Sequence, residues 1–155
     1  MISLRTATER DAVAVARLVN TAFLVEKFFI ERDRTNPGTV RELLEKGNFL
    51  LAEDASCLAG CVYYELRGER GYFGMLSVDP SCQGTGVGRL LVSTAEKVFK
   101  DAGCKYSDMK IVNVREELYA LYRRWGYAET GASPYDDPVP TKIPVHFIHM
   151  SKPLD

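Results

Sequence analysis

Three glycines alternate with other residues in this 155-residue sequence, at Gly84, Gly86 and Gly88, and their spacing is the clearest indication of a functional site. They follow an apolar run that ends at Val78 and precede a stretch with helical periodicity. Glycine permits positive φ and leaves neighbouring N–H groups unobstructed, and at a helix N-terminus unpaired donors and the helix dipole favour negative charge. We therefore predict that residues 83–89 bind an anion, and a diphosphate suits them best.

Two other phosphate-binding loops do not fit this segment. The Walker type requires lysine after its last glycine, and Arg89 follows Gly88 instead. The dinucleotide fingerprint Gly-x-Gly-x-x-Gly, begun at Gly84, requires its final glycine at the same Arg89 position. The loop is therefore of a different kind.

The segment resembles the signature Gln/Arg-x-x-Gly-x-Gly/Ala of the GCN5-related N-acetyltransferases, because it reads Gln-Gly-Thr-Gly-Val-Gly from position 83. The resemblance implies acetyl-coenzyme A (acetyl-CoA) as donor, with its pyrophosphate on the amides of residues 84–89. It also implies that pantetheine lies along the end of the preceding strand, which carries a bulge in that family. The residues assigned to the cofactor in this way are Leu76, Ser77, Val78, Gln83, Gly84, Thr85, Gly86, Val87, Gly88 and Arg89.

A second stretch resembles the family's other signature, in which Leu-Tyr is followed four residues later by glycine and an aromatic residue. Here Tyr122 is the tyrosine and Gly126 the glycine. A phenol with an ordinary pKa of about 10 is protonated at neutral pH and can donate a proton to a departing thiolate. We therefore expect Tyr122 to act as the general acid, and Tyr119 is the alternative if the helix is rotated.

The sequence departs from the family seven residues before this tyrosine, where Arg115 replaces the usual asparagine. Asn113 lies two residues earlier and is our candidate for the missing contact to the cofactor. Arg115 with Glu117 is interpreted as a feature of the helix start, where an acidic residue is favourable.

The acceptor amine must lose a proton, so a base or a water chain is required. Glu65 is the candidate base, and Glu26 and His146 are weaker ones. His146 and His149 have an odd spacing that puts them on opposite faces of a strand, so no metal site is predicted. Because no Cys-His pair favours a covalent intermediate, even with Cys82 near the loop, direct attack in a ternary complex is expected.

Hydrophobic periodicity predicts an α/β fold of about seven strands and about four helices. The resemblance implies their order and a mixed, centrally splayed sheet that the helices flank. The expected strands are 2–6, 49–53, 58–67, 72–78, 106–112, 127–131 and 145–151. The expected helices are 9–23, 39–46, 87–102 and 116–125. A capping box of Thr39 and Glu42 is expected to open the second helix.

The composition is that of an ordinary globular protein, with a net charge of −1 and 26% charged residues, and this disfavours nucleic acid as a partner. No stretch supplies the roughly 20 apolar residues that span a membrane. We expect one acetyltransferase domain over residues 1–155, a cytoplasmic location and four reduced cysteines. A homodimer is left open.

Two segments are expected to select the acceptor, a partly helical mobile lid at 24–38 and a loop at 133–144. Their acidic residues hint at a cationic acceptor such as a polyamine, an aminoglycoside, an amino acid or a peptide N-terminus: Glu26, Glu31, Asp33, Asp136 and Asp137. The leading prediction is an N-acetyltransferase that acts on a primary amine of a small molecule or peptide. Two alternatives remain, a catalytically inactive acyl-CoA-binding module and a nucleotide-binding enzyme.

Overall fold

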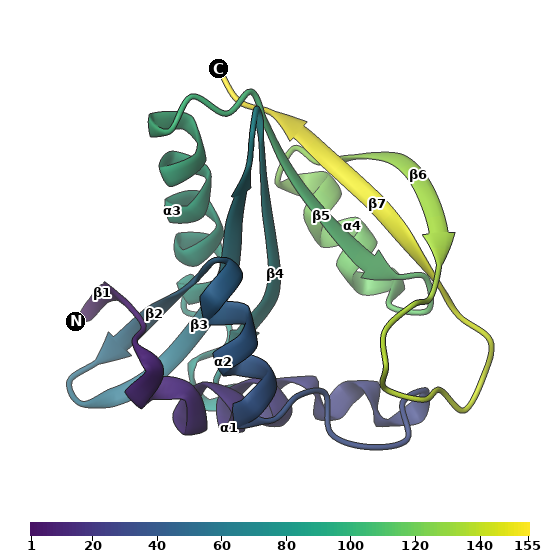
Figure 1. Ribbon diagram of the computed structural model, residues 1–155, viewed down its shortest axis with the longest axis horizontal. Helices are drawn as coiled ribbons and strands as arrows, with labels where there is room; N and C mark the ends of the chain where they lie inside the picture. Colours follow the sequence, from purple (N-terminus) through teal and green to yellow (C-terminus); the bar gives the residue numbers. More distant parts are fainter.

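The computed structural model describes residues 1–155, whose strands form one seven-stranded mixed sheet with helices on both faces (Figure 1). The strand order is β1-β2-β3-β4-β5-β7-β6, and only the β4–β5 pair is parallel. The strands are β1 (Ile2–Thr6), β2 (Asn48–Asp54), β3 (Cys57–Arg67), β4 (Arg70–Val78), β5 (Tyr106–Val112), β6 (Ala128–Pro134) and β7 (His146–Pro153). The helices are α1 (Ala12–Ala22), α2 (Pro37–Lys46), α3 (Val87–Asp101) and α4 (Glu116–Arg124). The predicted fold class is confirmed.

Each face of the sheet has its own hydrophobic core, because side chains alternate along a strand. On β3, Val62 and Tyr64 lie in the core that includes the buried face of α3 and Tyr122 of α4. Cys61 and Tyr63 lie in the other core, with the buried faces of α1 and α2. The two faces therefore form separate compartments.

The sheet opens in the middle, between its two parallel strands. β4 and β5 pair only from Arg70–Tyr106 to Tyr72–Asp108, after which the strands diverge (Figure 1). Beyond Tyr72, the edge of β4 that would face β5 has no strand partner, and its backbone groups need other hydrogen-bond partners. The sheet is thus splayed at its centre, between β4 and β5, as the sequence analysis expected.

α3 is positioned by the apolar stripe that the sequence predicted. Leu91, Ala95 and Phe99 follow at intervals of four residues and are fully buried against the sheet. Full burial of a large apolar side chain contributes roughly 1.5–3 kcal/mol, so the helix holds the glycine-rich loop at its N-terminus firmly against β4.

The start of α2 differs from the expectation. Asn36 is the N-cap, its Oδ1 accepts a hydrogen bond from the Thr39 amide at 2.9 Å, and Pro37 takes the first helical position. Asparagine followed by proline is a stronger start signal than a capping box at Thr39, because the proline φ is already helical and its missing N–H is not needed there. None of the helices is long and apolar enough to cross a membrane.

Candidate active site

The glycine-rich loop has the conformation of an anion cradle. Gly84 and Gly86 have φ of 81° and 90°, and Gly86 is the N-cap of α3. No atom lies within 4 Å of the position that a Cβ would take at either glycine, so the backbone is open to a ligand. The first-turn amides of α3 have no partners within the helix, which suits a diphosphate.

A β-bulge distorts β4 where the strands diverge. Tyr63 of β3 pairs with Gly74, but Cys61 pairs with Ser77, so Met75 and Leu76 together face one residue of β3. Met75 has φ of 52°, in the left-handed region that methionine rarely adopts. The predicted bulge is thus present and begins at Met75, which the sequence analysis missed because methionine carries no signal for positive φ.

A single cavity of about 1210 Å³ connects the cradle with the splayed strands. Ten of the predicted site residues line it: Glu65, Leu76, Val78, Gln83, Gly84, Gly86, Val87, Gly88, Arg89 and Tyr122. The structure therefore brings both predicted catalytic residues and most of the predicted cofactor residues to one space.

Three predicted cofactor residues do not line the cavity. Ser77 is 1% exposed and its Oγ donates to the Met75 carbonyl oxygen at 3.0 Å. Thr85 is exposed on the loop and donates to the Cys82 carbonyl oxygen. Asn113 Oδ1 accepts from the His146 amide at 2.9 Å, so its side chain ties the end of β5 to β7.

Tyr122 lies on the α3–α4 face, packed edge-on against Trp125 at a centroid distance of 5.4 Å and tilted against Phe73 at 6.0 Å. Burial raises the pKa of its phenol above the ordinary value, and the charge of Arg115 opposes this only in part. The hydroxyl donates no hydrogen bond within the chain although the residue lines the cavity. It is therefore a protonated donor without a partner in the protein.

Tyr119, the alternative proton donor, lies away from the cavity. Its side chain does not line the cavity, and its hydroxyl donates to Glu129 Oε1 at 3.2 Å on β6. The helix therefore turns Tyr122, and not Tyr119, toward the cavity, as the spacing of Tyr122 to Gly126 predicted.

Glu65 extends from β3 on the opposite face, in register with Tyr72 of β4. Its carboxylate accepts hydrogen bonds from the Tyr63 hydroxyl and the Arg67 guanidinium. Burial alone would raise the pKa of Glu65, but these two donors together with the charges of Arg67 and Lys46 lower it below the usual value. Glu65 is therefore ionised at neutral pH.

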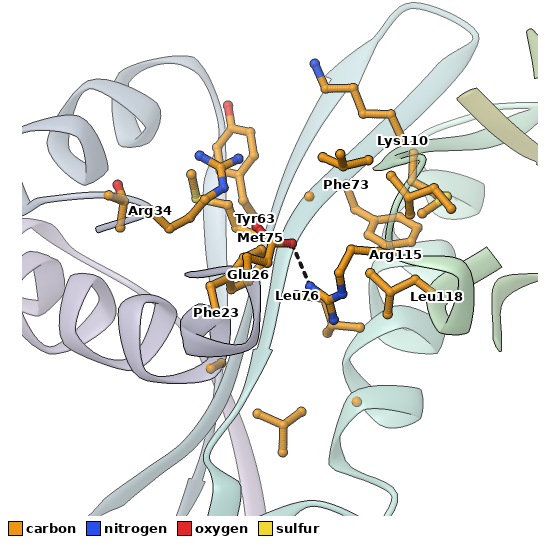
Figure 2. Close-up of a pocket in the computed structure, with 18 of the residues that line it drawn as sticks. Phe23, Glu26, Arg34, Tyr63, Phe73, Met75, Leu76, Lys110, Arg115 and Leu118 are labelled. Atoms are coloured by element: carbon orange, nitrogen blue, oxygen red, sulfur yellow. Dashed lines mark hydrogen bonds and ion pairs between the residues drawn. The ribbon is translucent and has the colours of Figure 1, made fainter. Parts of the chain in front are cut away.

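A second carboxylate in the cavity is held by the residue that breaks the family pattern. Arg115 Nη1 donates to Glu26 Oε2 at 2.6 Å (Figure 2), and Arg115 Nε donates to Glu117 Oε2 at 3.1 Å. Burial raises the pKa of Glu26, and the charges of Arg115 and Arg34 oppose the rise. The sequence analysis expected Arg115 and Glu117 at the start of this helix, where the structure has them, but neither ion pair of Arg115 had a sequence signal.

The two segments expected to select the acceptor, residues 24–38 and 133–144, pack against each other, and together they are called the roof. Residues 23–28 form a 3₁₀ helix, and the following Phe29 and Ile30 are buried against Val139. Ile30 forms an isolated β-bridge with Thr141. The lid is thus partly helical as predicted, and it is fastened to the 133–144 loop rather than free of it.

Comparison with known proteins gives a family. The sequence model described as the Acetyltransferase (GNAT) family matches residues 14–127, more than half of the chain. No protein of curated function matches the sequence.

Solved structures share the fold across almost the whole chain. The ribosomal-protein-S18-alanine N-acetyltransferase from Escherichia coli is 16% identical with a TM-score of 0.78, covering 100% of this chain and 95% of that one. Nourseothricin acetyltransferase is 19% identical with a TM-score of 0.77, covering 99% of both chains. The protein yncA from Salmonella typhimurium, solved with its cofactor acetyl-CoA, is 20% identical with a TM-score of 0.73, covering 99% of this chain and 94% of that one.

Proposed function

The chain belongs to the acetyltransferase (GNAT) family, and from this premise we propose that it transfers the acetyl group of acetyl-CoA to a primary amine of a small molecule or peptide. The acceptor attacks directly, in a ternary complex. The observation that carries the proposal is that Tyr122 and Glu65 line one cavity from opposite faces of the splayed sheet. A proton donor and a proton acceptor then stand on the two sides of the reacting carbonyl.

Acetyl-CoA is the acetyl donor of this family, and the residues present fit it. The open amides at Gly84 and Gly86 would hold the pyrophosphate. The unpaired edge of β4 at the Met75–Leu76 bulge would offer backbone groups to the pantetheine amides. Acetyl-CoA supplies the acetyl group as a thioester, and the protein's residues handle the protons.

Tyr122 donates its proton to the sulfur that leaves. In the balanced step the amine nitrogen bonds to the acetyl carbon, the carbon–sulfur bond breaks, and the sulfur takes the phenolic proton. The raised pKa keeps the phenol protonated until negative charge develops on the sulfur. The phenolate then recovers a proton from solvent.

Glu65 takes the proton that the amine loses. A carboxylate that is ionised at neutral pH attracts the ammonium form of the acceptor, and its proton passes to solvent through water. Cys82 also lines the cavity, but its sulfur contacts only the Ser81 hydroxyl, at 3.7 Å, and no histidine lines the cavity to activate it. These contacts favour direct attack over an acetyl-cysteine intermediate.

The test is release of free thiol from acetyl-CoA with a panel of primary amines, alongside calorimetric titration with coenzyme A and with ATP. We expect thiol release that depends on the amine and a preference for coenzyme A. Tight binding of coenzyme A with no thiol release for any amine would identify an inactive binding module instead. Preferential binding of ATP would contradict the assignment of the cradle.

A further inference from the structure

Lys110 of β5 lies on the same face of the sheet as the proposed base Glu65. Its neighbours Met109 and Ile111 lie in the core beneath α3 and α4, so the alternation of the strand sends Lys110 to the other face, with Tyr63 and Glu65. Continuing the β4–β5 register beyond Tyr72–Asp108 puts Lys110 level with Gly74, where the strands have already separated. Lys110 thus stands at the open part of the splay.

Every acidic side chain that lines the cavity already has a basic partner. The four pairs are Glu26–Arg115 at 2.6 Å, Asp137–Arg34 at 3.0 Å, Asp33–Lys27 at 3.3 Å, and Glu65 with Arg67. Of the acidic residues that hinted at a cationic acceptor, the three that line the cavity, Glu26, Asp33 and Asp137, therefore already have a basic partner, and Glu31 and Asp136 do not line it. The cavity is lined by seven basic residues against these four acidic ones, so its charge balance is positive.

Three of the seven basic residues have no carboxylate within 4 Å, namely Arg32, Lys46 and Lys110. Arg32 and Lys46 are exposed, whereas Lys110 is half-buried. The Lys110 ammonium makes no hydrogen bond or ion pair in the protein, and it lies over the face of the Phe147 ring, at 4.1 Å from the ring centroid. A half-buried lysine whose ammonium has three unused donors is a binding group for an anion.

We infer that the acceptor is an amine that also carries an acidic group, as an amino acid does, and that Lys110 binds this group. The inference rests on the proposed function, because it names the substrate class of the same cavity. The acceptor amine lies toward Glu65 and its carboxylate toward Lys110. A polyamine or an aminoglycoside, with several positive charges and no acidic group, is disfavoured.

The experiment compares amino acids with their amides, which keep the amine and lose the acidic group. The ratio of kcat/KM for acid over amide is measured in the wild type, in Lys110→Met and in Lys100→Met, an exposed lysine on α3 that serves as the control. The ratio is compared between variants because amidation also changes the basicity of the amine. We expect the ratio to fall by about 10-fold to 100-fold in Lys110→Met, the worth of one charge-assisted hydrogen bond, and to stay unchanged in Lys100→Met.

A binding measurement separates this inference from the proposed function. The wild type and Lys110→Met are titrated with N-acetyl amino acids and with their amides, which bind as products without turnover. Tighter binding of the acid that is lost in Lys110→Met supports the inference even if no amine is acetylated, an outcome that would contradict the proposed function alone. Equal affinity for acid and amide in the wild type, or an unchanged acid preference in Lys110→Met, overturns the inference.

Discussion

Replacing Tyr122 by phenylalanine should separate chemistry from stability. The ring keeps its contacts with Phe73 and Trp125, and the deleted hydroxyl has no hydrogen-bond partner in the protein. The free energy of unfolding should therefore change by less than about 0.5 kcal/mol. Loss of a general acid should lower kcat by roughly 10² to 10⁴, which corresponds to about 2.7–5.5 kcal/mol of transition-state stabilisation.

The assay is steady-state thiol release, with urea unfolding and calorimetric titration of acetyl-CoA on the same variants. Tyr119→Phe is the matched control, because its hydroxyl bonds to Glu129 away from the cavity, and it should keep full kcat. Tyr127→Phe is the control for stability, because its hydroxyl is hydrogen-bonded within the protein. It removes hydrogen bonds to Ser107 and Glu96 and should cost about 1–3 kcal/mol of stability. Full activity in Tyr122→Phe would refute the assignment of the acid and leave only the cofactor cradle.

Three further substitutions test the cradle, the base and the roof. Gly86→Glu should abolish coenzyme A binding in calorimetry, because it places negative charge at the anion site. Gly86→Ala carries the same backbone strain at φ of 90° without the charge and should retain part of the binding. Equal losses in the two variants would show that the strain alone is responsible. Glu65→Gln should lower kcat/KM for the acceptor by roughly 10² or more while the Kd of acetyl-CoA stays constant, and a matching loss of cofactor affinity would argue against its role as base. Arg115→Met leaves the buried Glu26 unpaired and should cost about 3–5 kcal/mol in urea unfolding at neutral pH, with most of the loss recovered by adding Glu26→Gln. Burial already raises the pKa of Glu26, and removal of Arg115 raises this pKa further, so the folded variant holds the Glu26 proton more tightly than the unfolded chain does. The loss of unfolding free energy in Arg115→Met should therefore be small at pH 5 and grow toward pH 8. A loss that is independent of pH would contradict this.

Most of the fold could be predicted from the sequence because its signals are local. The stripe of α3 and the alternation of β3 depend on periodicity, and Gly84 and Gly86 mark positions where only glycine is comfortable. The same is true of Tyr122, because its spacing to Gly126 fixes which side of α4 it occupies.

The features that the sequence did not predict depend on contacts between distant segments. The Glu26–Arg115 pair joins residues 89 positions apart, and no local pattern connects them. Met75 adopts a left-handed conformation that the surrounding strands impose on a residue with no preference for it. Asn113 was a plausible cofactor contact by residue type, but the meeting of β5 and β7 gives its side chain a backbone partner at His146.

The position where the sequence departs from its family explains how the acceptor side is built. A side chain as short as asparagine at position 115 could not span to the 3₁₀ helix at 23–28, whereas a guanidinium does, and it also holds Glu117 on its own helix. The helix that carries Tyr122 is thereby joined to the roof that carries Glu26. The roof also includes the ion pair of Arg34 with Asp137, so Glu26 and Asp137, one carboxylate from each variable segment, are already paired within the protein. These two carboxylates therefore serve structure, and under the inference above the acceptor is selected by a group that remains unpaired in the cavity, the ammonium of Lys110.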